Sequence, residues 1–287
     1  AAGQNVVALC DVDSVVIEKR GAPFPSARKY TDFRKMIEKE KLDGVMVETT
    51  THARAWIACQ AMQMGMDAYI EKPMCLYITE GRHMVNTARK YNRVTQVGTQ
   101  QRSDPNFRLA CELVRNGRIG KLKRVETYVA ENNFTGPGPG WKEMPVPEGF
   151  DWDLWLGPVA TDHPYNPGYF SGGPGANCLQ WNMYWDFGAG QLTDMGSHTM
   201  DLAWNAIDTT LPTSAEGKGD PFNSEVTPVK LVTHFEHPAN DWRGPIRVSW
   251  YQGGAMPDTP AKFIDLNKID HGVLFEGTNG YLVADFN

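Results

Sequence analysis

Two short stretches of this chain carry residue types that can move protons. In the first, Glu71 and Lys72 lie at the end of a predicted strand, DAYIEKP at residues 67–73, that Pro73 closes. Ligands bind at the carboxyl ends of strands in open α/β sheets, and a lysine there can exchange a proton with a substrate oxygen. The residues alone leave an alternative, a surface lysine paired with Glu71.

The second stretch is GAGQLTDMGSHTMD, residues 188–201. Asp194, His198 and Asp201 follow one another at spacings of four and three, which a helix brings onto one face. A histidine beside a carboxylate is the usual form of an oriented general acid or base. The same pair could be half of a metal site, or a core histidine whose hydrogen bonds an aspartate satisfies.

A third signal concerns a dinucleotide. Residues 5–10 (NVVALC) form a β-branched, apolar run that ends at Asp11. A dinucleotide-binding fold has a glycine-rich turn after its first strand and an acidic residue at the end of its second. Asp11 fits that ribose-binding acid, in which case the glycine-rich turn would lie upstream of Ala1. The alternative is an aspartate that caps a turn.

The first half of the chain must position these groups by alternating strands and helices. The patterns predict strands at residues 5–10, 42–48, 67–73 and 94–98, and helices at residues 14–21, 29–41, 53–64, 79–91 and 105–116. Strands separated by helices of this length imply right-handed crossovers, which predict a Rossmann-like, doubly wound parallel sheet.

The second half predicts a different architecture. A long strand at residues 123–133 precedes a proline- and glycine-rich loop at 135–158, and further strands are expected at 228–236, 245–251, 272–276 and 280–284. GTNG at 277–280 indicates a hairpin. We therefore expect a dinucleotide-binding domain over residues 1–101, and an α+β domain with an open, largely antiparallel sheet over residues 102–287.

Composition narrows the class of protein. The chain has 28 Lys and Arg against 34 Asp and Glu, a net charge of −6, so no nucleic-acid partner is expected. Its apolar runs are too short to span a membrane. Five dispersed cysteines without a CxxC pair indicate packed thiols rather than a metal site. The first residues lack the features of a signal peptide, although one could have been removed. We therefore expect either a cytoplasmic or a periplasmic location.

Taken together and in their order along the chain, the motifs indicate a protein family more specifically than any single motif does. ETTTHAR, YIEKP, QVGTQQRSDPNF, DWDLWLGP and YWDFGAGQLTDMGSHTMD closely resemble the Gfo/Idh/MocA family of nicotinamide-dependent oxidoreductases, and above all its Trp-rich bacterial branch. The resemblance implies an N-terminal Rossmann domain. It also implies a C-terminal α/β domain whose open sheet often mediates homo-oligomers, here a dimer or a tetramer.

The resemblance also implies roles for individual residues. Lys72, Asp194 and His198 match the family's catalytic set. The residues expected beside the cofactor are Asp11, Thr49, Thr50, His52, Glu71, Lys72, Arg102 and Trp185. The carboxylate of Asp11 favours NAD over NADP, and no metal is expected.

The chain departs from the family pattern in two places. Thr50 and Thr51 stand where the family more often has Pro-Asp or Pro-Asn. The glycine-rich turn is not in the printed sequence, and a doubly wound sheet without a central strand should have unpaired backbone groups.

The function implied is hydride transfer between NAD and a hydroxyl-bearing carbon of a sugar, a sugar derivative or a cyclitol. One alternative is an NAD-dependent glycosidase that acts by transient oxidation and elimination. The other is a non-catalytic sugar-binding or assembly protein. The loop tryptophans, Trp152 and Trp155 among them, suit stacking on sugar faces or simple packing.

Overall fold

The chain forms two compact units. The computed structural model describes residues 3–129, 140–170, 180–259 and 264–286. Unit 1 comprises Ala1–Gly98, Gly140–Phe170 and Asp186–Gly188, and unit 2 comprises the rest of the chain. The sequence-based division assigned everything after residue 101 to the second domain. The structure instead groups residues 140–170 with the first unit, because their aromatic side chains pack there.

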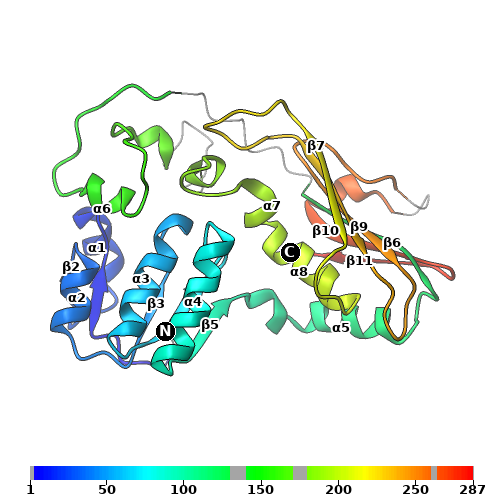
Figure 1. Ribbon diagram of the computed structural model, residues 1–287, viewed down its shortest axis with the longest axis horizontal. Coiled ribbons are helices and arrows are strands. Elements are labelled where there is room, and N and C mark those ends of the chain that lie inside the picture. The colour runs from blue at the N-terminus through cyan, green and yellow to red at the C-terminus, as the bar shows by residue number, and fades with distance from the viewer. Residues whose placement is uncertain (1–2, 130–139, 171–179, 260–263, 287) are drawn as a thin grey trace. The chain divides into compact units, whose positions relative to one another are not determined.

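Unit 1 has the predicted alternation of parallel strands and helices (Figure 1). Its strands are β1 (Ala8–Cys10), β2 (Arg28–Tyr30), β3 (Gly44–Val47), β4 (Asp67–Glu71) and β5 (Thr95–Gly98). They form two parallel ladders, β1-β2 and β3-β4-β5. Its helices are α1 (Ser14–Gly21), α2 (Phe33–Lys39), α3 (Thr51–Gln63), α4 (Ile78–Tyr91) and α6 (Trp152–Leu156).

One predicted helix begins later than expected. The helix predicted at residues 29–41 starts at Phe33, because the Asp32 side chain accepts the main-chain N–H of Arg34 and caps α2 there. Lys29 and Tyr30 instead belong to β2, which the prediction missed. Arg28 and Tyr30 both bind the Glu40 carboxylate, and these contacts fix β2 to the end of α2.

The core of unit 1 lies between the larger ladder and two helices. Figure 1 shows α3 and α4 side by side, and their inner faces pack on β3 and β4. The buried side chains there include Val47, Ala58, Met62, Ile70 and Met84. This apolar layer fixes where β3 and β4 end, and so where Thr49 and Lys72 lie.

Unit 2 is a six-stranded sheet with helices on one face. The strands, in the order β11-β10-β6-β9-β8-β7, are Tyr281–Asp285, His271–Gly277, Leu122–Val129, Ile246–Gln252, Leu231–His237 and Ser214–Gly219. Every pair is antiparallel except β6-β9. The predicted open, largely antiparallel sheet and the hairpin between β10 and β11 are thus confirmed.

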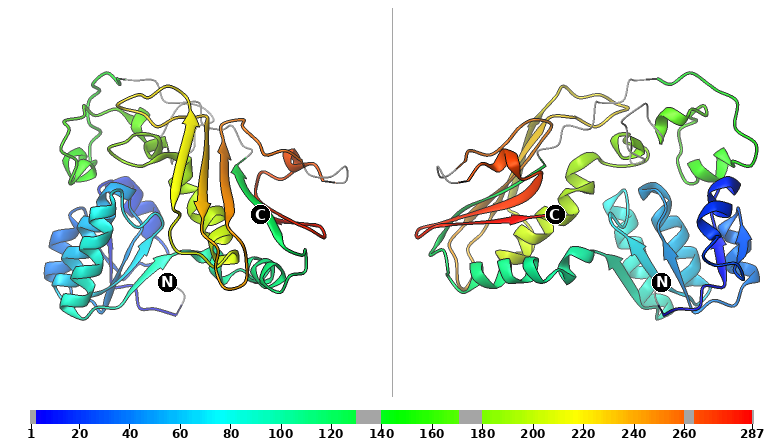
Figure 2. Two further views of the ribbon diagram at one scale, coloured as in Figure 1. Left: turned by 45° about the vertical axis from the view of Figure 1, so that its right-hand side comes forward. Right: turned by 180° about the vertical axis from the view of Figure 1, so that it is seen from behind.

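Helices α5 (Pro105–Arg115), α7 (Gly190–Asp194) and α8 (Gly196–Ala206) complete unit 2. Figure 2 shows α8 lying along one face of the sheet. The core between them contains Ala203, Val125, Val248, Trp250 and Phe275, which are all fully buried. Burial of this apolar surface holds α8 in place. It therefore also positions His198 and Asp201, which α8 carries.

Two details of the second half differ from expectation or lie outside it. β7 was missed because all six of its residues are exposed, so an edge strand there has no apolar alternation to detect. Residues 130–133 of the predicted long strand and residues 135–139 of the predicted loop lie outside the described residues.

Candidate functional site

The predicted site residues fall into two groups, one on each unit. Asp11, Thr49, Thr50, His52, Glu71 and Lys72 belong to unit 1, and Arg102, Trp185, Asp194 and His198 belong to unit 2. Within unit 1, all of them follow the carboxyl ends of β1, β3 or β4 or stand at them. That edge of a parallel sheet is the usual ligand-binding edge.

Asp11 caps a turn in this structure. Its Oδ1 accepts the main-chain N–H of Asp13 at 2.9 Å, directly after β1. Burial raises the pKa of Asp11, and the hydrogen bond from Asp13 offsets part of that rise. The Asp11 carboxylate therefore makes the turn-capping bond, and its role on a ribose stays a prediction.

The loop after β3 is tied to the loop after β4 by one arginine. Arg54 Nε donates to the carbonyl of Thr49 at 2.9 Å, and Arg54 Nη1 donates to the carbonyl of Pro73 at 2.6 Å. Arg54 is buried, and Thr50 is the N-cap residue of α3. The threonine pair and the Lys72–Pro73 segment are therefore held together as one edge.

Glu71 orients the main chain at Lys72. The Glu71 carboxylate accepts the main-chain N–H of Lys72 through Oε2 at 2.7 Å. Its other oxygen lies over Gly98 of β5, where an added Cβ would come within 2.5 Å of Glu71 Oε1. Only glycine at position 98 leaves Glu71 this place beside Lys72.

His52, predicted to stand beside the cofactor, is buried at the start of α3. Its ring is 2% exposed and its Nε2 donates to the carbonyl of Trp155 at 2.9 Å. The ring also packs against Trp155 and Phe187. Burial lowers the pKa of His52 to about 4, so the imidazole is neutral at physiological pH. These contacts show that His52 packs within unit 1, and its place beside a cofactor stays a prediction.

The aromatic side chains of residues 140–170 mostly pack on one another. The rings of Trp152 and Trp155 stack with their centroids 4.7 Å apart, and both side chains are buried. Buried His163 donates from Nε2 to the Asp186 carboxylate at 2.8 Å, a pair that the sequence analysis did not find. Of the two interpretations of Trp152 and Trp155, the structure favours packing.

On unit 2, the helix that carries the second chemical stretch is interrupted. α7 ends at Asp194, Met195 intervenes, and α8 begins at Gly196. The main-chain N–H of His198 donates to Met195 at 3.0 Å, while the Ser197 hydroxyl donates to the Asp194 carbonyl. A continuous helix would have joined His198 N–H to that carbonyl. The helical spacing considered for Asp194 and His198 is therefore interrupted at Met195, immediately before Gly196.

Asp194 and His198 are nevertheless both deeply buried. Asp194 is 5% exposed and His198 is 4% exposed. The ring centroids of His198 and Phe286 lie 4.9 Å apart, and Phe286 follows β11. The ring of Phe286 also contacts that of His271. Two titratable side chains are thus buried four residues apart in this stretch.

Two further buried polar residues adjoin this stretch and were not found from the sequence. The amide of Gln191 is buried, and neither Gln191 Oε1 nor Gln191 Nε2 has a hydrogen-bond partner among the described residues. Asn182 Nδ2 donates to the carbonyl of Gly190, whereas Asn182 Oδ1 likewise has no such partner in the described structure. The sequence offered one signal for Gln191, its place within the GAGQLTD stretch. The contact of Asn182 with Gly190 is visible only in the tertiary structure.

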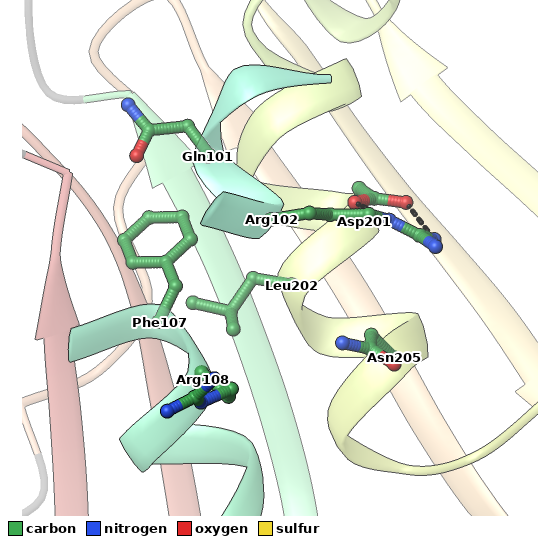
Figure 3. Close-up of a pocket in the computed structure, with 7 residues that line it drawn as sticks. All are labelled: Gln101, Arg102, Phe107, Arg108, Asp201, Leu202 and Asn205. Atoms are coloured by element: carbon green, nitrogen blue, oxygen red, sulfur yellow. Dashed lines mark hydrogen bonds and ion pairs between the residues drawn. The ribbon is translucent and has the colours of Figure 1, made fainter. Parts of the chain in front are cut away.

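Arg102 is bound to Asp201, as Figure 3 shows. Arg102 Nε and Nη2 donate to the two carboxylate oxygens of Asp201 at 2.7 and 2.6 Å. Asp201 lies one turn after His198 on α8. A small pocket beside this ion pair is lined by Gln101, Phe107, Arg108, Leu202 and Asn205. Arg102 therefore braces the helix that carries His198.

Trp185 is held within unit 2. Its Nε1 donates to the carbonyl of Asn223 at 2.9 Å, and its main-chain N–H donates to Glu225 at 3.0 Å. These contacts engage its only side-chain donor, so the described geometry gives no further support for its predicted place beside the cofactor.

The unit 1 residues fit parts of a nicotinamide dinucleotide. The carboxylate of Asp11 suits ribose hydroxyls, and the hydroxyls of Thr49 and Thr50 and the ammonium of Lys72 suit the nicotinamide half. Among the described residues, no strand of unit 1 is followed by a glycine-rich turn that would hold the pyrophosphate. The residues present thus fit the two ends of the cofactor.

Other classes of site are not found where the structure describes the chain. Within residues 3–129, 140–170, 180–259 and 264–286, no group of three His, Cys, Asp or Glu side chains could hold a metal ion. No helix within those same ranges is both long and apolar enough to cross a membrane.

The fold and the ligand-binding edge together define a two-unit protein of the dinucleotide-binding Rossmann class. Residues 1–99 match the oxidoreductase family domain described as an NAD-binding Rossmann fold, and residues 127–226 match that family's C-terminal alpha/beta domain. The two matches cover more than half of the chain, so the chain belongs to the Gfo/Idh/MocA oxidoreductase family. NAD is the cofactor of that family's N-terminal domain.

Individual relatives are more distant. The chain is 31% identical over 136 residues to D-apiose dehydrogenase of Paraburkholderia graminis, across 47% of this chain and 36% of that one. It is 26% identical over 143 residues to a glycosyl hydrolase family 109 protein of Shewanella baltica, across 45% and 30%. The chain thus spans about a third of the length of the curated relatives it matches.

A solved structure shares the fold over nearly the whole chain. Myo-inositol 2-dehydrogenase from Lactobacillus plantarum superposes with a TM-score of 0.62 at 18% identity, covering 99% of this chain and 70% of that one. This likeness confirms the two-unit architecture.

Proposed function

We propose that this protein is an oxidoreductase that transfers a hydride between NAD and a hydroxyl-bearing carbon of a sugar, sugar derivative or cyclitol. The observation that carries the proposal is the buried Asp194 and His198 pair, in a chain whose first 99 residues match an NAD-binding family domain. The sugar and cyclitol dehydrogenases among its relatives support the substrate class.

In this proposal each catalytic residue has one task. His198 or Lys72 takes the proton of the substrate hydroxyl, and Asp194 orients the imidazole of His198. When bound, NAD supplies the acceptor for the hydride. Asp11, Thr49, Thr50 and Glu71 hold the cofactor or its surroundings, and Arg102 braces α8. We further propose that copies of the chain assemble through the open sheet of unit 2.

Two measurements on the purified protein test the proposal. The first is the absorbance and mass of any small molecule that denaturation releases, where NAD or NADH is the expected result. The second is NADH formation with added NAD and a panel of polyols headed by D-apiose and myo-inositol. Formation of NADH in step with an oxidised polyol supports the proposal, and no oxidised product from any polyol contradicts it.

The match to glycosyl hydrolase family 109 proteins favours one alternative, a glycosidase that oxidises and re-reduces its substrate. Such an enzyme would use the same residues. Incubation with aryl glycosides separates the two: release of reducing sugar without net NADH indicates the glycosidase, whereas stoichiometric NADH indicates the dehydrogenase.

A further inference from the structure

The buried amide of Gln191 is a polar group that the fold leaves unsatisfied. The Gln191 side chain is on α7, three residues before Asp194, so both project from one face of that helix. Gln191 is 4% exposed, and within the described structure neither its oxygen nor its nitrogen has a hydrogen-bond partner. The large majority of buried side-chain polar atoms in proteins are paired, so an amide with both ends unpaired requires an explanation.

A purely structural explanation does not account for it. Burying an amide without hydrogen-bond partners carries a desolvation penalty. An apolar side chain of similar volume at position 191 would avoid that penalty and stabilise the fold more. The same region contains a second such atom, Asn182 Oδ1, on a side chain that Gly190 holds in place. One amide with neither end paired, that of Gln191, and one with only its nitrogen paired, that of Asn182, thus lie within the GAGQLTD stretch or against it among the described residues.

We propose that Gln191 is a substrate-binding residue, which accepts a hydrogen bond from one substrate hydroxyl and donates one to another, with Asn182 Oδ1 as a second acceptor. Polyols suit this arrangement, because each hydroxyl both donates and accepts and an amide side chain does the same. The ligand class is therefore a sugar or cyclitol with neighbouring hydroxyls. This inference rests on the proposed function and adds a residue that forms hydrogen bonds with the substrate hydroxyls.

The test replaces the amide without changing its volume much. Gln191→Met keeps an unbranched side chain and removes both polar atoms. We measure binding of the panel headed by D-apiose and myo-inositol by calorimetry, the KM and kcat for any polyol that is oxidised, and the thermal midpoint. The expected result is binding weakened about tenfold, from the loss of two hydrogen bonds, with an unchanged or raised thermal midpoint.

Tyr128→Phe is the matched control. The Tyr128 hydroxyl is also fully buried without a partner among the described residues, but it packs with Leu266 and Leu274 on the sheet face opposite α8. Its removal should leave polyol binding unchanged. A structural water on Gln191 would move only the stability, whereas a substrate contact moves the binding constant and KM.

The outcomes are separable from those of the proposed function. Wild-type affinity in Gln191→Met, equal weakening in Tyr128→Phe, or a wild-type protein that binds none of these polyols would each overturn the inference. Polyol binding that Gln191→Met weakens, without any hydride transfer in the wild type, would support the inference while rejecting the proposed dehydrogenase.

Discussion

His52 Nε2 donates a hydrogen bond to the carbonyl of Trp155 at 2.9 Å, across 103 residues of chain. His52 opens α3 after β3, and Trp155 lies in the short helix α6. This bond, with the packing of Phe187 on the same ring, attaches the aromatic segment to the parallel unit. The segment's place in unit 1 thus depends on a histidine that remains neutral.

Acid should therefore weaken unit 1 through His52. Because burial lowers the pKa of His52 from 6.5 to about 4, the unfolded chain takes up this proton first as the pH falls. The stabilising contribution is complete above pH 6.5 and is lost between pH 6.5 and 4, at up to about 1.4 kcal/mol per pH unit. Urea unfolding across that range measures the loss, and His52→Phe should flatten it. His83, exposed on α4, is the control, since His83→Gln should leave the slope intact.

His198 should be required for turnover and not for folding. General acid–base assistance contributes about 10²–10⁴ in rate, so His198→Gln should lower kcat by at least the smaller factor. Glutamine preserves much of the buried volume beside Phe286, and the thermal midpoint should fall little. The comparison is His83→Gln, which should retain full kcat. Near-normal turnover in His198→Gln would remove His198 from the catalytic set.

Gly98→Ala should disturb Lys72 through Glu71. The new Cβ would stand 2.5 Å from Glu71 Oε1, so the carboxylate must move and its bond to the main-chain N–H of Lys72 lengthens. The flexible end of the Glu71 side chain can move away, so we expect the free energy of unfolding to fall by only about 1 kcal/mol. We expect kcat to fall as well, because the carboxylate no longer orients the main chain at Lys72. At Gly244 a Cβ meets nothing within 4 Å, and Gly244→Ala should change neither quantity. Unaltered kcat in Gly98→Ala would show that Glu71 is not needed at Lys72.

Arg102 and Asp201 should behave as one unit in a double-mutant cycle. The two-bond contact joins partly exposed side chains, so a coupling of about 0.2–1 kcal/mol is expected for Arg102→Gln and Asp201→Asn. Urea unfolding of the four proteins measures the coupling, which high salt should reduce. Strictly additive effects would contradict it. Loss of NAD affinity in Arg102→Gln alone would instead indicate direct contact with the cofactor.

The described cysteines should react slowly in the folded protein. Burial raises the pKa of Cys10 to about 12 and also raises the pKa values of Cys59, Cys75 and Cys111. Since the thiolate is the nucleophile, alkylation at about pH 8 should be slow for all four and rapid after unfolding in urea. Peptide mapping by mass spectrometry follows each site. Rapid labelling of Cys10 in the native protein would contradict the packed-thiol interpretation.

Local patterns in the sequence determined the fold class and most of its elements. Strand β4 before Pro73, the Phe33 and Ile37 stripe of α2 and the GTNG hairpin each have a period or a turn signal that short-range physics dictates. Where that signal is absent, prediction failed: exposed β7 has no alternation, and β2 is specified by its pairing with β1 rather than by its own three residues.

Only the tertiary structure showed which contacts each candidate side chain makes. Through the resemblance to the family, the order of motifs predicted Lys72, Asp194 and His198 as a set. It could not show that His52 is committed to Trp155, that Arg102 is committed to Asp201, or that Gln191 is buried with neither end of its amide paired among the described residues. Burial and hydrogen-bond partners arise from segments tens of residues apart that the core brings together, and no local pattern encodes them.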